Sequence, residues 1–222
     1  DVAGRGDVVD ELSHGTTFVA GGVSSSQASG NLPGGSNVTI LDDYTQSDAS
    51  DEGRAMAELI YDIAPASDII YHTAFKGLGN FAQGIDDLRV AGADVIVDDI
   101  GYANDPAFQD GIVTQAVDDV YLDHDVLYFS SAGNANDETY FGTWNEGPSS
   151  NNFHSFSGSS GDERLNIELD PGENVRIFLQ WDDAWGAADT DFDLFLYRGD
   201  TDAVVASSTT NNNGVLGIGK TD

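Results

Sequence analysis

The stretch Ala93-Asp94-Val95-Ile96-Val97 decides the fold. It is a short, nearly continuous apolar run, and such a run is typical of a strand that is covered on both faces. Two comparable runs lie before and after it, Asp68-Ile69-Ile70-Tyr71-His72-Thr73-Ala74 and Val126-Leu127-Tyr128-Phe129-Ser130. We therefore expect neighbouring parallel strands at residues 68–74, 93–97 and 126–130.

Apolar residues recur at helical spacing between these runs. One helix is predicted at residues 52–63 and another at residues 110–123. The helix between the first two strands is expected to bury four apolar side chains, Phe81, Ile85, Leu88 and Val90. The alternation of strands and helices predicts an α/β fold, in which a parallel sheet is covered by helices and joined by right-handed crossovers.

The composition changes after about residue 140. A segment rich in Asn, Gly and Ser, residues 145–161, reads as a linker. Beyond it, apolar and polar residues alternate in three segments separated by turn residues, at 165–169, 175–181 and 192–197. Alternation with period two predicts a partial antiparallel β-sandwich.

The pattern predicts two domains, an α/β domain at residues 1–145 and a linker with the β-sandwich at residues 146–222. The predicted strands are fewer than the seven or eight of a complete sandwich. We therefore expect the chain to be the N-terminal part of a longer protein.

The charge is strongly negative, with 39 Asp and Glu against 8 Lys and Arg and a formal net charge of -31. Nucleic acid and anionic membranes carry the same sign, so neither is an expected partner. No apolar run reaches the roughly 18 residues of a membrane helix, so no membrane insertion is expected. Acidic residues are spread along the whole chain, which favours halophilic adaptation over an ordinary acidic protein.

Polar residues follow three of the predicted strands, and sites of α/β sheets form at such carboxyl ends. Ser13-His14-Gly15 follows an early strand near residues 8–12, Asp98-Asp99-Ile100-Gly101 follows the central run, and Ser131-Ala132-Gly133-Asn134 follows the last one. The helix that begins at Glu52 points its N-terminus at the same edge.

These segments resemble the motifs of subtilases, the subtilisin-like serine peptidases. Ser131-Ala132-Gly133-Asn134 is similar to the motif that ends in the oxyanion-hole asparagine, so the resemblance implies that role for Asn134. A side-chain amide there donates a hydrogen bond to a developing oxyanion. The alternative is a turn asparagine, because Gly-Asn is common in turns.

The segment Asp51-Glu52-Gly53-Arg54-Ala55-Met56 lies where subtilases carry the helix with the His-Gly-Thr motif. It resembles a subgroup in which this sequence replaces the histidine motif, which implies that Glu52 is the general base. The related sedolisins use glutamate as the base for their serine. The alternative is that Glu52 only favours the helix dipole as an acid in the first turn.

The resemblance implies a triad aspartate after the first strand, and His14 occupies that position. Histidine cannot replace the anionic residue that orients the base. Three explanations stay open: the triad is altered, Asp10 serves instead, or the protein is inactive. A rival alignment compares His14-Gly15-Thr16 with the His-Gly-Thr motif itself.

Asp98-Asp99-Ile100-Gly101 occupies the position of the subtilase substrate-binding strand, where peptides add as a further strand. The resemblance therefore implies substrate contacts for Asp98, Asp99 and Gly101, and the alternative is that the acids are solvated loop residues. No Gly-Thr-Ser nucleophile motif is present. The β-rich part resembles the jelly-roll-like domain that some subtilases insert before this serine.

Five carboxylates of the β-rich part fall in a short span and are candidates for calcium, at Asp182, Asp183, Asp189, Asp191 and Asp193. Calcium takes six to eight oxygen ligands. The order of an EF-hand loop is absent, and such clusters arise readily in an acidic protein. The preferred interpretation is therefore solvated acids, with no metal and no cofactor.

The sequence predicts the N-terminal part of a secreted serine endopeptidase from a high-salt environment, with protein or peptide as substrate. Because the nucleophile motif is missing, the chain alone is not expected to hydrolyse peptides. One alternative is a catalytically inactive peptide-binding or cell-surface module. Another is an adhesive extracellular protein, against which the Asn134 and Glu52 motifs argue.

Overall fold

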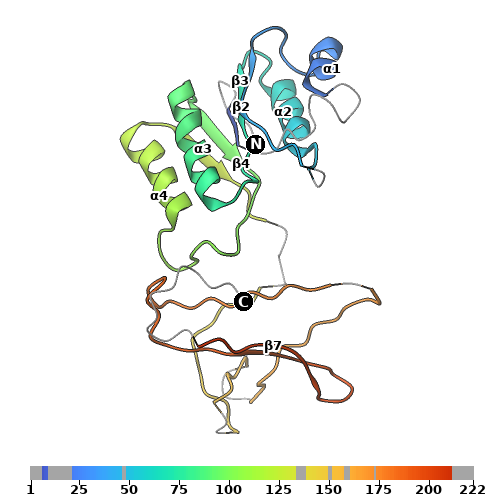
Figure 1. The fold of residues 1–222 in the computed structure, drawn as a ribbon, viewed down its shortest axis with the longest axis vertical. Helices are drawn as coiled ribbons and strands as arrows, with labels where there is room; N and C mark the ends of the chain where they lie inside the picture. The colour runs from blue at the N-terminus through green and yellow to red at the C-terminus, as the bar shows by residue number, and fades with distance from the viewer. Residues whose placement is uncertain are drawn as a thin grey trace. The chain divides into compact units, whose positions relative to one another are not determined.

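A five-stranded parallel sheet is the central feature of residues 7–133. The computed structural model describes residues 7–9 (backbone only), 22–46, 49–133, 139–149, 152–157, 161–172 and 174–211. The sheet has the order β2-β3-β1-β4-β5, and every pairing in it is parallel. Figure 1 shows β2, β3 and β4 among the helices. Its strands are β1 (Asp7–Val9), β2 (Val38–Asp42), β3 (Ile69–His72), β4 (Val95–Asp98) and β5 (Leu127–Ser130).

The three strands predicted from the apolar runs are confirmed as β3, β4 and β5, and they are parallel. The expectation that all three are neighbours is wrong, because β1 lies between β3 and β4. Asp7 is in register with Ile70 on one side and with Ile96 on the other. The first strand of the chain is thus the middle strand of the sheet, and a local apolar pattern cannot reveal such an insertion.

Helices connect the strands in the predicted order. They are α1 (Gly22–Ser29), α2 (Glu52–Ile63), α3 (Leu78–Ala91) and α4 (Ile112–Asp118), which continues into a π-helical segment, η1 (Asp119–Asp123). The predicted helix at 52–63 is confirmed, and the one at 110–123 begins two residues later than expected. α1 was not predicted, because its serine-rich sequence has only two strong helix formers, Gln27 and Ala28, and no apolar stripe.

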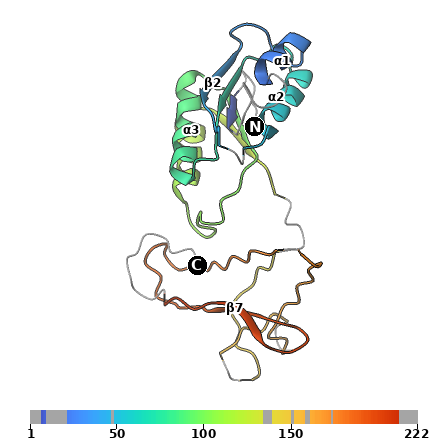
Figure 2. The same ribbon diagram turned by 45° about the vertical axis from the view of Figure 1, so that its right-hand side comes forward.

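Side chains of β3 alternate between two apolar cores, one on each face of the sheet. Ile70 packs with Phe81, Ile85 and Leu88 of α3 in the first core. The prediction that Val90 is also buried is wrong, because it is 68% exposed. In the second core Ile69 and Tyr71 pack with residues of α1 and α2, namely Val23, Ala57, Met56 and Ile60. Helices therefore cover both faces, α3 and α4 on one and α1 and α2 on the other (Figure 2).

This arrangement corrects the expectation that every crossover is right-handed. The connections β2-α2-β3 and β3-α3-β4 run in the same direction across the sheet, but their helices lie on opposite faces. Two such crossovers must have opposite hands. The connections through α3 and α4 share one hand, and the one through α2 has the other. Because about 98% of parallel crossovers are right-handed, the α2 connection is the rare left-handed one.

The face of β5 opposite α4 is open among the described residues. Tyr128 packs against the core under α3 and α4, so its neighbours Leu127 and Phe129 point to the other face. Leu127 is 47% exposed and Phe129 is 55% exposed. β5 also ends the sheet, with β4 as its one partner. Strands of parallel sheets are normally covered on both faces, so this apolar surface is suited to a further packing partner.

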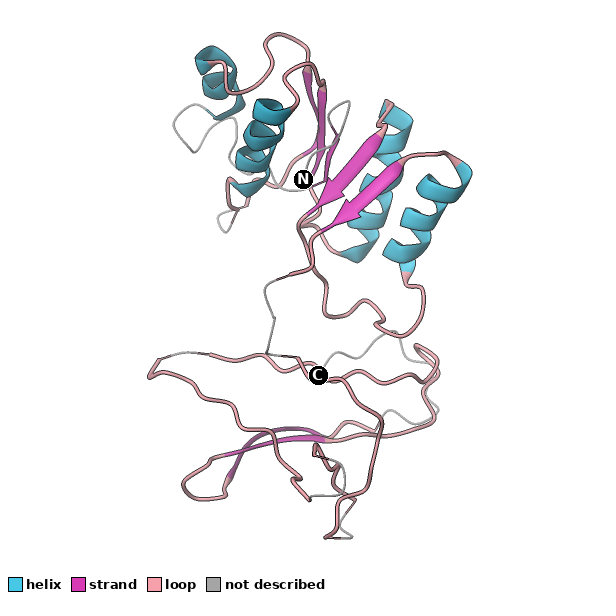
Figure 3. Cartoon of the chain, turned by 180° about the vertical axis from the view of Figure 1, so that it is seen from behind, coloured by secondary structure: helices cyan, strands magenta, loops and turns pink. Residues whose placement is uncertain are grey.

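The predicted β-sandwich is not confirmed. The strand predicted at 192–197 is present as β6 (Leu194–Tyr197), which pairs antiparallel with β7 (Val204–Ser208). The strands predicted at 165–169 and 175–181 are wrong, because the described residues there have no regular secondary structure (Figure 3). Their alternating apolar residues, such as Leu165 and Ile167, are about half exposed. Alternation marks an amphipathic strand only where a partner supplies ladder hydrogen bonds.

Contacts group the chain into two units, Asp1–Ala132 with Leu179–Asp222, and Gly133–Phe178. The domain boundary predicted at residue 145 stays a prediction. In the second unit aromatic rings surround His154, which contacts Tyr140, Trp144 and Phe156. The His154 ring nitrogens also hydrogen bond to the Tyr140 hydroxyl at 2.9 Å and the Asn145 amide at 3.2 Å. The cluster is partly exposed and lies at an isolated antiparallel bridge between Glu146 and His154.

Candidate active site

The carboxyl ends of the five strands are aligned along one edge of the sheet. In register, Asp42 pairs with His72, His72 with Val9, Val9 with Asp98, and Asp98 with Ser130. The segments that carry the predicted site residues leave the sheet from this row. This shared edge is the candidate active site.

Glu52 is the first residue of α2, which follows β2 at this edge, and its side chain is exposed. The residue before the helix, Asp51, does not cap it through its side chain. Instead the Asp51 carboxylate receives two hydrogen bonds from the Arg54 guanidinium, the one from Nε at 2.9 Å. Arg54 therefore fixes the turn that presents Glu52.

Arg54 also ties α2 to α1. Its Nη1 donates to Glu58 Oε1 and to Ser26 Oγ, both at 2.8 Å, and the Ser26 hydroxyl hydrogen bonds to Glu58. The hydrogen bond to Asp51 raises the pKa of the Arg54 guanidinium, and the charge of Glu58 adds to this effect. The motif around Glu52 thus has a structural part, Asp51 and Arg54, that holds the helix start in place.

The other two predicted catalytic residues, His14 and Asn134, lie outside the described residues. The structure describes part of the chain that precedes each of them. The described part of β1 reaches Val9, and Asp10 and His14 follow it in the sequence. Gly133, immediately before Asn134, has a φ of 71°, a left-handed conformation that favours glycine.

The three predicted substrate-contacting residues differ in exposure. Asp99 and Gly101 are exposed, and their contact with substrate stays a prediction. Asp98 is 3% exposed, so the alternative that it is a solvated loop acid is wrong. Its Oδ1 accepts a hydrogen bond from Ser130 Oγ at 2.7 Å, and its Oδ2 accepts one from the Tyr128 hydroxyl. Asp98 is therefore integrated into the sheet through β5.

The loop after β4 is anchored by Tyr102. Its hydroxyl donates to the Ala74 carbonyl oxygen at 2.5 Å and accepts from the Gly77 amide at 3.0 Å. Burial raises the pKa of Tyr102, so the hydroxyl keeps the proton that it donates. The Tyr102 ring also packs against Phe81. The segment that carries Asp99 and Gly101 is thus fixed at its far end to the β3–α3 connection.

Asp42 links the end of β2 to the chain between β3 and α3. Its carboxylate receives a 2.6 Å hydrogen bond from the Lys76 ammonium group and a 3.4 Å one from Asn80 Nδ2. Burial alone would raise the pKa of Asp42, but the hydrogen bond and charge of Lys76 more than offset this, so the pKa lies below its usual value. The ion pair holds the chain where it leaves β3.

Sequence reasoning missed His72, a buried histidine in the row of strand ends. It is 3% exposed, and its Nδ1 lies 2.8 Å from the Thr73 carbonyl oxygen, so Nδ1 carries the proton. Its Nε2 lies 3.7 Å from Asp87 Oδ2 on α3. The sequence signal was a polar residue at the end of an apolar run, the same signal that was used for Asp98.

Gly84 makes room for this ring. A Cβ atom on Gly84 would lie 2.4 Å from Nδ1 of His72. Gly84→Ala is therefore expected to destabilise the protein by about 1–3 kcal/mol, the usual cost of overpacking, measured by urea unfolding in molar salt. Gly79→Ala on the same helix is the matched control, because nothing lies within 4 Å of its added Cβ atom. His72→Ser should restore much of the stability of Gly84→Ala, and equal destabilisation by both glycine substitutions would contradict the account.

The candidate calcium ligands do not gather in the structure. No group of three or more His, Cys, Asp or Glu residues that could hold a metal ion occurs among the described residues. Asp183 instead accepts hydrogen bonds from the backbone amides of Asp189 and Thr190, at 3.1 and 2.6 Å. The Thr190 amide is the main cause of a lowered Asp183 pKa. The Asp183 carboxylate thus joins the two ends of the loop formed by residues 183–190.

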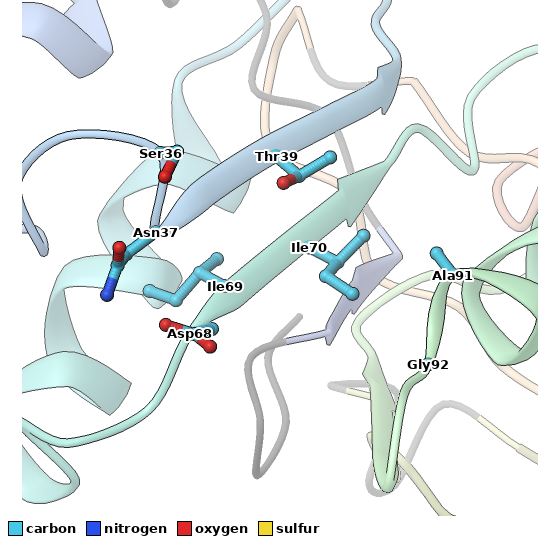
Figure 4. Close-up of a pocket in the computed structure, with 8 residues that line it drawn as sticks. All are labelled: Ser36, Asn37, Thr39, Asp68, Ile69, Ile70, Ala91 and Gly92. Carbon is cyan, nitrogen blue, oxygen red and sulfur yellow. The ribbon is translucent and has the colours of Figure 1, made fainter.

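A pocket of about 260 Å³ opens at the opposite edge of the sheet (Figure 4). Residues that precede or begin β2 and β3 line it together with the end of α3, namely Ser36, Asn37, Thr39, Asp68, Ile69, Ile70, Ala91 and Gly92. Ligands of open α/β sheets bind at the carboxyl ends of the strands. The pocket lies at the amino ends, so we assign no function to it.

Comparisons of the chain with protein-family models, curated proteins and solved structures find no match. None of the helices in the described part of the chain is long and apolar enough to span a membrane.

Proposed function

We propose that the chain is the N-terminal part of a secreted, salt-adapted serine endopeptidase of the subtilase kind. The observation that supports this most is the alignment of strand ends. In the sequence Asp10 follows β1, Glu52 begins the helix after β2, and Asn134 follows β5, and these three strands belong to one parallel sheet whose carboxyl ends share an edge. This order supports the proposal that residues far apart in the sequence act together.

Each residue has a role in the proposed reaction. The Glu52 carboxylate accepts the proton of the nucleophilic serine as its oxygen attacks the peptide carbonyl carbon. The Asn134 amide donates a hydrogen bond to the resulting oxyanion. The proton then passes to the leaving amine as the C–N bond breaks, and water hydrolyses the acyl-enzyme. Asp10 is proposed to orient the base in place of His14, because the orienting residue is an anion and Asp10 supplies a carboxylate.

The substrate peptide is proposed to lie along the segment after β4. Asp99 and Gly101 are exposed there, and Tyr102 anchors the loop beyond them. An extended peptide can pair with such a segment through backbone hydrogen bonds. The serine is proposed to come from the polypeptide that follows residue 222. This polypeptide is proposed to pack against Leu127 and Phe129 on the open face of β5.

The test is hydrolysis of casein in molar salt by the longer polypeptide, with its downstream serine. We expect turnover by the longer polypeptide and none by the 222-residue chain, whatever the pH. A serine-to-alanine variant of the longer polypeptide is the control for contaminating peptidases. A folded longer polypeptide that cleaves no peptide would refute the proposal.

A second candidate is a non-catalytic peptide-binding module, which His14 favours because it occupies the position where the resemblance implies the triad aspartate. The two candidates differ in a measurable way. An inactive relative would bind unfolded casein without cleaving it, and the binding would survive the serine-to-alanine substitution unchanged.

A further inference from the structure

Asp98 connects β4 to the end of β5 through three hydrogen bonds. Its carboxylate accepts one from Ser130 Oγ at 2.7 Å and one from the Tyr128 hydroxyl. Its backbone carbonyl oxygen accepts the third, from the Ser131 amide at 3.1 Å. All three donors belong to residues 128–131, where the chain leaves the sheet toward Asn134.

This contact lies inside the protein. Asp98 is 3% exposed, on the face that α3 and α4 cover, so substrate cannot reach its carboxylate without displacing the two hydroxyl groups. Burial raises the pKa of Tyr128 far above its usual value, and the charge of Asp98 adds to the effect. The Tyr128 hydroxyl therefore keeps the proton that it donates to Asp98.

The contact also lies next to a change of chain direction. Gly133 has a φ of 71°, which only glycine adopts readily, so the chain turns two residues after Ser131. At the other end of β5 the Leu127 amide donates to the Asp94 carbonyl oxygen at 3.1 Å, a backbone contact with no side chain involved.

We propose that Asp98 is a positioning residue, which holds the end of β5 where the chain leaves the sheet and continues in the sequence toward Asn134. The catalytic consequence rests on the proposed function, in which Asn134 stabilises the oxyanion. The effect of Asp98 on the end of β5 does not rest on the proposed function, and it can be measured on the 222-residue chain.

The first experiment compares amide hydrogen exchange at the two ends of β5 by NMR in molar salt. In Asp98→Ala we expect the Ser131 amide to exchange at least about tenfold faster, a change of about 1.4 kcal/mol in local opening, while the Leu127 amide changes much less. Asp98→Asn keeps the shape and one acceptor oxygen, while its amide nitrogen can only donate to the second hydroxyl, so exchange at Ser131 should lie between the wild type and Asp98→Ala. Asp94→Asn, which removes an exposed carboxylate before the same strand, is the matched control.

Equal acceleration of amide exchange at Leu127 and Ser131 would mean that Asp98 contributes only to the general stability of the protein. No acceleration of exchange at Ser131 would mean that Asp98 does not hold the end of β5. Either result overturns the proposal. If Asp98→Ala does not fold, Ser130→Ala removes a single donor of the same contact and is judged by the same comparison.

The second experiment measures kcat and KM for casein-derived peptides with the longer polypeptide. Asp98→Ala is expected to lower kcat by roughly 10–100-fold with KM nearly unchanged, because a shift of about 1 Å in a catalytic group can cost 100-fold. Asp98→Asn should recover part of kcat. Unchanged kcat in folded Asp98→Ala would overturn the catalytic consequence. An inactive wild type would refute the proposed function instead, and hydrogen exchange would then decide the positional claim alone.

Discussion

Glu52→Gln is expected to lower the turnover of casein by the longer polypeptide by roughly 10²–10⁴-fold, the usual effect of losing a general base. The amide keeps the shape of the side chain and removes its capacity to accept a proton. The substitution should leave stability nearly unchanged, because Glu52 is exposed at the start of α2 and the turn before it is held by Asp51 and Arg54. Initial rates at saturating casein, with a thermal melt of each variant, measure both quantities.

The pH profile separates a carboxylate base from a histidine base. A carboxylate remains ionised at pH values where histidine is protonated, so activity should stay high below neutral pH. Full activity in Glu52→Gln would reduce Glu52 to an acid that favours the helix dipole. Loss of activity in His14→Ala together with full activity in Glu52→Gln would instead support the alignment of His14-Gly15-Thr16 with the His-Gly-Thr motif.

Transfer from molar salt to dilute buffer is expected to lower the melting temperature of the 222-residue chain by roughly 10 °C or more. The chain has 39 acidic and 8 basic residues, and Arg54, Lys76, Arg89 and Arg198 already pair with carboxylates. The remaining acids repel one another over about 10 Å at 0.1 M salt but only about 3 Å at 1 M. A few kcal/mol of added repulsion corresponds to a shift of this size, since each kcal/mol moves the melting temperature by roughly 2–4 °C.

A matched variant tests whether charge is the cause. Asp118 and Asp123 are exposed on α4 and η1, and their replacement by Asn should reduce the salt dependence of melting. Sucrose, which stabilises proteins without screening charge, should raise the melting temperature of the wild type and the variant equally. Identical melting in dilute and molar salt would show that the acidic composition is not a salt adaptation.

Local patterns were sufficient for several elements of the α/β part, but not for α1, for the irregular segments at 165–169 and 175–181, or for the order of the strands. β3, β4 and β5 are short apolar runs, and α2 has an apolar stripe, so each could be predicted. β1 has only three residues, and its place between β3 and β4 depends on pairings that no window of sequence contains. The left-handed connection through α2 could not be predicted either, because handedness follows from which face the helix packs against.

The candidate site was predictable as a region and not as a set of contacts. A polar residue after an apolar run correctly indicated the strand ends at Asp98 and Ser130. The same signal could not distinguish the exposed Asp99 from the buried Asp98, because that difference depends on hydroxyl groups of β5, about 30 residues away. His72 was missed for the same reason, since its burial requires the space that Gly84 on α3 leaves free.

The most direct test of the central claim is the reaction of the longer polypeptide with a fluorophosphonate probe, followed by mapping of the labelled peptide by mass spectrometry. The account predicts one adduct, on a serine that follows residue 222, and slower labelling in the Glu52→Gln and Asn134→Ala variants, because the adduct needs both the base and the oxyanion donor. A folded polypeptide that gains no adduct, or one whose labelling is indifferent to both substitutions, would contradict it.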